Sequence, residues 1–323
     1  LSEIKIYPHG NSTINHKNKD LRIPLNKEQG NYLLNSDSDI KVNGDVSFGI
    51  STIDRQNGAP YNKNGVYSIK LFFDDNLIHH FEVDELSFSE KRFINSHIDY
   101  ACYIDNSIRF NRCYTLAYNK LSNYKKNVNK GIINFSDSLL HKIRFEVSDI
   151  KGNTSILNFN IQSEKNKSKF NKTDNGDIIL YNKAKVYSSL NFEAHLEKYS
   201  LYENCEISYS EGLKTDSTFS EIHDFMNANI PVHKEYGVSI KSNIPNNLKD
   251  KVYIAKVRND GTFKYKGKTW RDEFLTAITR EFGKYAIVAD TINPVISDIT
   301  ISTQKNKFGN IGSVSVKITD NQS

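Results

Sequence analysis

The sequence predicts an all-β protein made of tandem antiparallel β-sandwich domains of the immunoglobulin-like type, with a short helical insertion in the first domain. Three observations predict this class. Apolar and polar residues alternate in many short runs, as in half-buried strands. Asn-Gly and other Gly-containing turn signals separate these runs. Finally, 18 Tyr and 18 Phe supply bulky core side chains to a chain of 323 residues that is only 37% hydrophobic.

The first domain is predicted to contain several hairpins. Asp39–Thr52 alternates on both sides of Asn43-Gly44-Asp45, which is typical of a hairpin turn. Val66–Phe73 and Leu77–Val83 alternate around a polar turn and predict a second hairpin. A third hairpin, between residues 143 and 161, has its turn at Asp149-Ile150-Lys151-Gly152-Asn153.

The period of the apolar residues changes after the second hairpin. We predict a helix over Ser89–Tyr103, with Ser89 as its N-cap, within an insertion near residues 89–130. The apolar face of this helix would be formed by Phe93, Ile94, His97, Ile98 and Ala101.

The domain boundaries follow from composition. The first domain spans residues 1–163, and the polar, Lys/Asn-rich stretch 164–176 is a linker. A second β-sandwich spans 177–290, where Phe274–Phe282 fits a helix or a strand and its β-branched residues favour the strand. Residues 291–323 form a partial third β unit with two strands, too few to bury a core alone.

Charge and cysteine content narrow the function classes. The net charge of +5, with scattered lysines, gives no indication of nucleic-acid binding. No run approaches the roughly 20 apolar residues of a membrane helix. Cys102 and Cys113 could form a disulfide, but three cysteines cannot all pair, and buried free thiols are the simpler expectation. The start at Leu1 without Met or a signal peptide suggests a processed or trimmed end.

Histidines are the first candidates for a metal site. The sequence has no H-x-H and no H-E-x-x-H motif. His79 and His80 are adjacent in a strand and should point to opposite faces, and His97 on a helix should point in a third direction. We therefore expect structural histidines and neither a catalytic nor a metal-binding residue in this segment.

Other chemical motifs are weak. No G-x-S-x-G and no Gly-rich phosphate loop is present. Acidic pairs at Asp74-Asp75 and Asp84-Glu85 could hold calcium, although solvated turn residues are more common. A sugar could stack on exposed aromatic rings, and Trp270 is the candidate ligand-binding residue. Further rings that could serve are Tyr199, Tyr202, Tyr253 and Tyr265.

Several segments together resemble a known family. Gly65–Tyr100 is similar to the region downstream of the catalytic domain in lysostaphin-type zinc metallopeptidases of Bacteroides-like bacteria. The later Thr279-Arg280-x-Phe282-Gly283-x-Tyr285 and Asp290-Thr291-x-x-Pro294 look like the C-terminal portion of the same proteins. Shorter matching patterns are Asn119-Lys120-Leu121-Ser122-x-Tyr124, Gly131-Ile132-Ile133-Asn134 and Asp149-x-x-Gly152-Asn153.

The resemblance implies the non-catalytic C-terminal β-domains of a secreted or periplasmic peptidoglycan endopeptidase. Its zinc would belong to a catalytic domain upstream of Leu1, because no position matches the family's zinc ligands. The implied partners are that catalytic domain and peptidoglycan or a glycan, outside the cytoplasm. The alternative is a surface β-sandwich adhesin or glycan-binding module. A self-contained enzyme with an unrecognised site is a third possibility.

Overall fold

The computed structural model describes residues 1–36, 39–56, 59–165, 176–306 and 309–320. It is an all-β protein with 52% strand and 7% helix, which confirms the predicted class. The chain divides into two compact units, each described below by itself. Unit 1 comprises residues 1–183, 199–206 and 229–233, and unit 2 comprises 184–198, 207–228 and 234–323. Most of the predicted linker, residues 166–175, lies outside the described residues.

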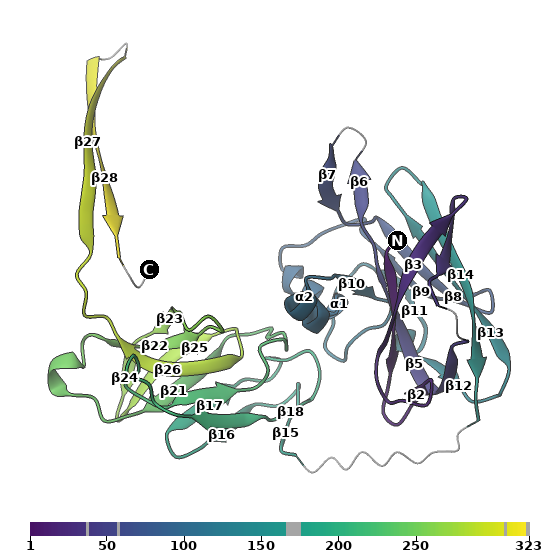
Figure 1. The fold of residues 1–323 in the computed structure, drawn as a ribbon, viewed down its shortest axis with the longest axis horizontal. Coiled ribbons are helices and arrows are strands. Elements are labelled where there is room, and N and C mark those ends of the chain that lie inside the picture. Colours follow the sequence, from purple (N-terminus) through teal and green to yellow (C-terminus); the bar gives the residue numbers. More distant parts are fainter. Residues whose placement is uncertain (37–38, 57–58, 166–175, 307–308, 321–323) are drawn as a thin grey trace. The chain divides into compact units, whose positions relative to one another are not determined.

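Unit 1 is organised around a sheet whose strand order is β10-β5-β1-β3-β4-β14-β13-β8-β9-β11, with β2 and β12 also pairing with β5 (Figure 1). The main strands are β1 (Glu3–Pro8), β2 (Thr13–Ile14), β3 (Leu21–Glu28), β4 (Asn31–Leu34), β5 (Lys41–Ser51), β8 (Ser68–Phe73), β9 (Asn76–Glu82), β10 (Phe110–Arg112), β11 (Tyr124–Asn127), β12 (Ile133–Phe135), β13 (Leu140–Ser148) and β14 (Thr154–Ser163). Two short pairs stand apart from it: β6 (Asp54–Gln56) with β7 (Ala59–Asn64), and β15 (Ile178–Ile179) with β18 (Cys205–Glu206).

Part of this sheet closes into a five-stranded barrel. The long strand β14 pairs in parallel with β4 at Leu157↔Tyr32 and with β5 at Ser163↔Val42. The path β5-β1-β3-β4-β14 therefore returns to its own start, a closure that the sequence analysis did not predict. Phe48 of β5 and Phe159 of β14 belong to the core of unit 1, and Phe145 of the neighbouring β13 contacts both rings at 6.4 Å.

Two of the three predicted hairpins of unit 1 are confirmed. Strands β8 and β9 pair around Asp74 and Asp75, which have positive φ values of 47° and 63°. Strands β13 and β14 pair around a turn with Gly152 at φ 86°. In both cases residues with left-handed backbone conformations close the turn.

The predicted hairpin turn at residues 43–45 is wrong, because β5 runs straight through it. Gly44 has φ +84°, and a Cβ there would lie 2.5 Å from the Ser12 hydroxyl oxygen. That hydroxyl instead accepts a hydrogen bond of 2.7 Å from the Asp45 backbone N–H. The glycine is needed for the close approach of Ser12, and the chain does not reverse there.

The predicted helix over Ser89–Tyr103 is broken into shorter pieces. A 3₁₀ turn, η1 (Lys91–Phe93), leads into α1 (Ile94–His97), and α2 (Tyr100–Asn106) follows. Ile98 between them is extended, with ψ 155°. Asp99 is the N-cap of α2 and accepts a hydrogen bond from the Cys102 N–H, so it begins a new helix inside the predicted one. Within the described part of the chain, no helix is long and apolar enough to cross a membrane.

Unit 2 contains two five-stranded sheets, ordered β16-β17-β21-β25-β24 and β19-β20-β26-β22-β23. Phe192 of the first sheet contacts the rings of Tyr209 and Phe225 of the second, at 5.4 and 5.5 Å, so the two sheets share a core. The ambiguous segment at Phe274 is a strand, as favoured from its β-branched residues. The strands are β16 (Lys185–Ser188), β17 (Phe192–Leu196), β19 (Tyr209–Gly212), β20 (Ile222–Phe225), β21 (Tyr236–Lys241), β22 (Val252–Val257), β23 (Phe263–Gly267), β24 (Thr269–Arg271), β25 (Phe274–Thr279) and β26 (Gly283–Ala289), with a 3₁₀ turn η3 (Asn246–Leu248).

The predicted third β unit is a hairpin of β27 (Val295–Asn306) and β28 (Gly309–Thr319). Its apolar side chains are exposed, for example Ile301 at 75% and Val314 at 67%. The two strands therefore bury little apolar surface between them, as expected for an isolated pair.

Candidate functional site

The adjacent histidines of β9 point to opposite faces, as predicted. His79 is fully buried, and its Nδ1 lies 3.2 Å from the Asn127 amide oxygen. His80 is half-buried, with its Nε2 3.1 Å from the Ser68 hydroxyl and 3.3 Å from the Glu82 carboxylate. The two histidines therefore have different partners on the two faces of β9.

His97 does not point away from His79, contrary to the prediction. Both rings contact Tyr124, with centroid distances of 5.8 Å for His97 and 5.5 Å for His79. The His97 ring also stacks on Phe81 at 3.9 Å, and its Nδ1 lies 3.0 Å from the Tyr124 hydroxyl. His97 is the last residue of the short helix α1, and its ring packs against Phe81 of β9 and Tyr124 of β11.

The environment of these two histidines keeps them uncharged. Burial lowers the pKa of His79 to about 4 and that of His97 to about 3, so both rings are neutral at pH 7. The Nε2 atoms of both are buried without a hydrogen-bond partner. Among the described residues, no three His, Cys, Asp or Glu side chains come together in a group that could hold a metal ion.

The acidic pairs considered for calcium are engaged by cations. Asp74 lies 2.7 Å from the His141 Nδ1, and Asp84 lies 2.6 Å from the Lys125 ammonium. Asp75 lies 3.4 Å from the Lys142 ammonium. Asp74, Asp75 and Asp84 therefore each have a nearby cationic or imidazole partner, which favours the solvated-turn interpretation.

The three cysteines are free thiols. Cys102 and Cys113 are both buried, and the disulfide considered for them is not formed. Burial raises the pKa of the Cys113 thiol far above its usual range, so it is not a nucleophile at neutral pH.

A buried ionic cluster in unit 1 surrounds Asp99. The Lys5 ammonium lies 2.6 Å from the Asp99 carboxylate and 2.9 Å from that of Asp20, and the Tyr7 hydroxyl donates to Asp99 at 3.0 Å. The Arg112 guanidinium lies 3.9 Å from the other Asp99 oxygen. Two cations lie beside two carboxylates in these contacts, and the Asp99 side chain is only 3% exposed. We name these residues the Asp99 cluster, and its role is to fix the start of α2 against β1.

The charged groups of the Asp99 cluster stabilise one another in their ionised forms. Burial alone would raise the pKa of Asp99, but the hydrogen bond from Lys5 and the charge of Arg112 lower it overall. Burial alone would lower the pKa of Lys5, and its bonds to Asp99 and Asp20 raise it overall. Both groups therefore remain charged at neutral pH.

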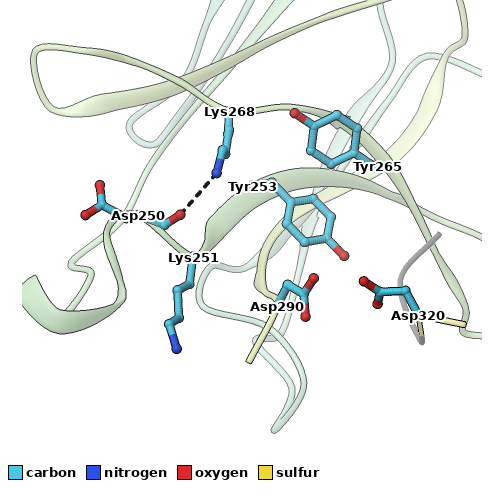
Figure 2. A pocket seen from close by; sticks show the side chains of 7 residues that line it. All are labelled: Asp250, Lys251, Tyr253, Tyr265, Lys268, Asp290 and Asp320. Carbon is cyan, nitrogen blue, oxygen red and sulfur yellow. Dashed lines mark hydrogen bonds between the residues drawn. The ribbon is translucent and has the colours of Figure 1, made fainter. Parts of the chain in front are cut away.

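Unit 2 contains a pocket lined by two tyrosines and by charged side chains (Figure 2). Tyr253 of β22 and Tyr265 of β23 form its aromatic wall, with ring centroids 5.1 Å apart and an interplanar angle of 44°. Tyr253 is 4% exposed, whereas Tyr265 is 53% exposed and offers a ring to solvent. The cavity measures about 460 Å³, within the usual range for small-molecule sites.

Polar groups surround this aromatic wall. The Lys268 ammonium donates to the Asp250 backbone carbonyl at 3.1 Å, and Figure 2 shows the Tyr253 hydroxyl directed toward the carboxylates of Asp290 and Asp320. Burial raises the pKa of Tyr253, and these two negative charges raise it further. The phenol therefore stays protonated at neutral pH. We call this site, lined also by Lys251, the tyrosine pocket.

The structure brings together only some of the aromatic residues proposed from the sequence. Tyr253 and Tyr265 share the tyrosine pocket, whereas Tyr199 and Tyr202 belong to unit 1. Trp270 on β24 is 36% exposed, and its indole N–H donates to the Lys249 carbonyl at 3.2 Å. Trp270 does not line the pocket, but it holds the residue that precedes Asp250.

The polar side of this pocket was not predicted from the sequence. Asp290 was read only as a domain boundary, yet β26 carries it next to the start of β22, where its N–H donates to the Lys251 carbonyl at 3.0 Å. Tyr253 lies on β22, Tyr265 on β23, and Lys268 between β23 and β24. The alternation Lys264-Tyr265-Lys266 was a signal for the Tyr265 ring alone, because it places both ammonium groups on the opposite face of the strand.

Comparison with known proteins finds a similarity for one part of the chain. No match was found among curated proteins. A profile of the Zu5-like domain matches residues 177–290, less than half of the chain. This range coincides with the second predicted domain and includes Tyr253, Tyr265 and Asp290, so the tyrosine pocket lies largely in a segment that is similar to the Zu5-like domain.

Proposed function

We propose that this chain forms the non-catalytic β-domains of a secreted or periplasmic zinc metalloendopeptidase that acts on peptidoglycan. Its role would be to bind the wall polymer and to position a catalytic domain encoded upstream. The resemblance of Gly65–Tyr100 and Thr279–Tyr285 to the accessory region of such peptidases supports the assignment to a zinc endopeptidase. The immunoglobulin-like assignment also belongs to this proposal, and the two facing sheets of unit 2 support it.

The tyrosine pocket is the observation that carries the binding role. A sugar ring can stack on the exposed face of Tyr265, because aromatic faces offer apolar area to the C–H side of a sugar. The Lys268 ammonium and the Asp290 carboxylate supply a donor and an acceptor for hydroxyl groups. Such an aromatic wall with a few polar groups is typical of binding sites.

The pocket can be tested by titrating the full chain with soluble muropeptides and with chitooligosaccharides, followed by NMR. We expect saturable shifts around Tyr265 and a loss of about tenfold in affinity in Tyr265→Ala, since one stacking ring is removed. Tyr103→Ala, at a tyrosine of unit 1 that is 39% exposed, is the matched control. Equal binding by wild type and Tyr265→Ala would exclude the pocket.

Trp270 is tested in the same titration. Trp270→Phe keeps a ring and removes the hydrogen bond to Lys249, and Trp270→Ala removes both. If Trp270 stacks on the ligand, only the alanine variant weakens binding. If it acts through the Lys249 carbonyl, both variants weaken it.

The assignment to a zinc endopeptidase is tested by the reading frame upstream of Leu1. A zinc peptidase domain with an H-x-H motif there would support the accessory role. A frame without such a domain, combined with glycan binding by the tyrosine pocket, would favour the alternative of a surface adhesin or glycan-binding module.

A further inference from the structure

Three lysines of unit 2 converge on one carboxylate. The ammonium groups of Lys264 and Lys266 lie 2.9 and 3.0 Å from Oε1 of Glu281, and that of Lys256 lies 2.8 Å from its Oε2. We call these four residues the Glu281 cluster. Three positive charges against one negative charge leave a local excess of two positive charges.

The strand register forces this crowding. Lys256 of β22 lies directly opposite Lys264 of β23. Like charges directly opposite one another destabilise a sheet. Lys266 is the extra residue of a β-bulge, because Ile254 and Ala255 pair with Gly267 and Tyr265 on either side of it. Bulges often redirect a side chain near a functional site.

The backbone of Glu281 is held in place on several sides. Its N–H donates to the Thr279 hydroxyl at 3.3 Å, and its carbonyl accepts from the hydroxyls of Tyr236, at 2.9 Å, and of Tyr285. Tyr236 and Tyr285 are core residues, exposed by 2% and 0%. The carboxylate that gathers the lysines therefore projects from a rigid segment.

The cluster is partly enclosed but open to solvent on one side. The side chains of Lys266 and Lys256 are 10% and 18% exposed, whereas those of Glu281 and Lys264 are 37% and 47% exposed. Burial alone would raise the pKa of Glu281, but the hydrogen bonds from the three lysines hold it far below its usual range. Both carboxylate oxygens accept from lysines, and each ammonium retains further N–H donors.

We infer that the Glu281 cluster binds a doubly charged tetrahedral oxyanion, a phosphate or sulfate group, on the remaining N–H donors of Lys256, Lys264 and Lys266. A dianion balances the excess of two positive charges, which a single carboxylate group cannot do. A phosphate group also has enough acceptor oxygens to bridge three ammonium groups. This inference rests on the geometry of unit 2 and is independent of the proposed glycan site.

The probe is inorganic phosphate, titrated into the full chain at constant ionic strength with NaCl replacing phosphate. NMR of the lysine side chains should show saturable shifts at the three cluster lysines. Lys264→Gln is expected to weaken phosphate binding about tenfold, because one charge-assisted donor is lost. Lys264 is half exposed, so this variant should fold.

Lys241→Gln is the matched control. Lys241 is 43% exposed, belongs to unit 2 and pairs with one carboxylate, that of Glu273, at 2.5 Å. It removes the same charge outside the cluster and should leave phosphate affinity unchanged. Shifts no larger than with NaCl, equal binding by Lys264→Gln and wild type, or equal weakening by both variants would overturn the inference. Titration with glucose 6-phosphate then distinguishes free phosphate from a phosphate monoester as the ligand. Tighter binding of glucose 6-phosphate than of inorganic phosphate would indicate a monoester.

Discussion

The Asp99 cluster of unit 1 and the Glu281 cluster of unit 2 both gather cations around one carboxylate, but they differ in balance and in exposure. Two cations face two carboxylates around Asp99, whose side chain is 3% exposed. Three cations face one carboxylate at Glu281, which is 37% exposed. The first arrangement is complete without a ligand. The second leaves unbalanced charge where solvent can reach it, and this difference separates a structural ion cluster from a binding site.

From this comparison we expect the largest loss of stability on substitution of Asp99. Asp99→Ala leaves the buried Lys5 and Arg112 without their shared partner and should lower the free energy of unfolding by about 3–5 kcal/mol. Urea unfolding of the full chain, followed through NMR signals of β1 and β5, measures the change.

Two variants separate the causes of that loss. Asp99→Asn keeps an acceptor for the Cys102 N–H and removes only the charge, so most of the loss should remain if the charge is responsible. Asp20→Asn, at a carboxylate that is 45% exposed, should cost less than about 1 kcal/mol. An equal loss of unfolding free energy in Asp99→Ala and Asp20→Asn would contradict the view that the buried Asp99 is the main stabilising carboxylate of the cluster.

We expect the next largest effect on stability from protonation of the buried His79. It tests whether the interior of unit 1 accepts an unbalanced charge. The unfolded chain binds a proton at His79 near pH 6.5, but the folded chain binds it only near pH 4. Stability is therefore fully present above pH 6.5 and is lost as the pH falls toward 4, by about 3 kcal/mol for this group.

His79→Gln removes this titration and should flatten the decrease in unfolding free energy between pH 6.5 and 4. The measurement is urea unfolding at several pH values. His16→Gln, at a position 72% exposed, is the matched surface control. An unchanged slope in His79→Gln would show that the interior tolerates the proton.

Local patterns allowed the sequence to predict part of this fold. The hairpins β8–β9 and β13–β14 join residues close in sequence, so alternation and turn residues were sufficient. The barrel could not be predicted, because it depends on β14 pairing with both β4 and β5. The turn at Gly44 was mispredicted for the same reason: the hydroxyl that takes up its space belongs to Ser12, 33 residues from Asp45.

The candidate sites show the same limit. Tyr253 and Tyr265 could be selected as exposed-ring candidates from residue type, but their contact required the pairing of β22 with β23. The Glu281 cluster was invisible because its carboxylate is 15 residues from Lys266 and 25 from Lys256. Only the folded register shows that these charges meet.

The smallest predicted effect sharpens the comparison most directly. In phosphate-free buffer, Lys264→Gln removes one of two excess positive charges, so it should leave the stability of unit 2 unchanged or raise it by up to about 0.5 kcal/mol. Hydrogen exchange of the β22 and β23 amides measures this local stability. Lys241→Gln instead removes the partner of Glu273 and should lower stability by a similar small amount. If Lys264→Gln lowers stability as Lys241→Gln does, the lysines at Glu281 are ordinary ion pairs, and the excess charge does not strain the fold.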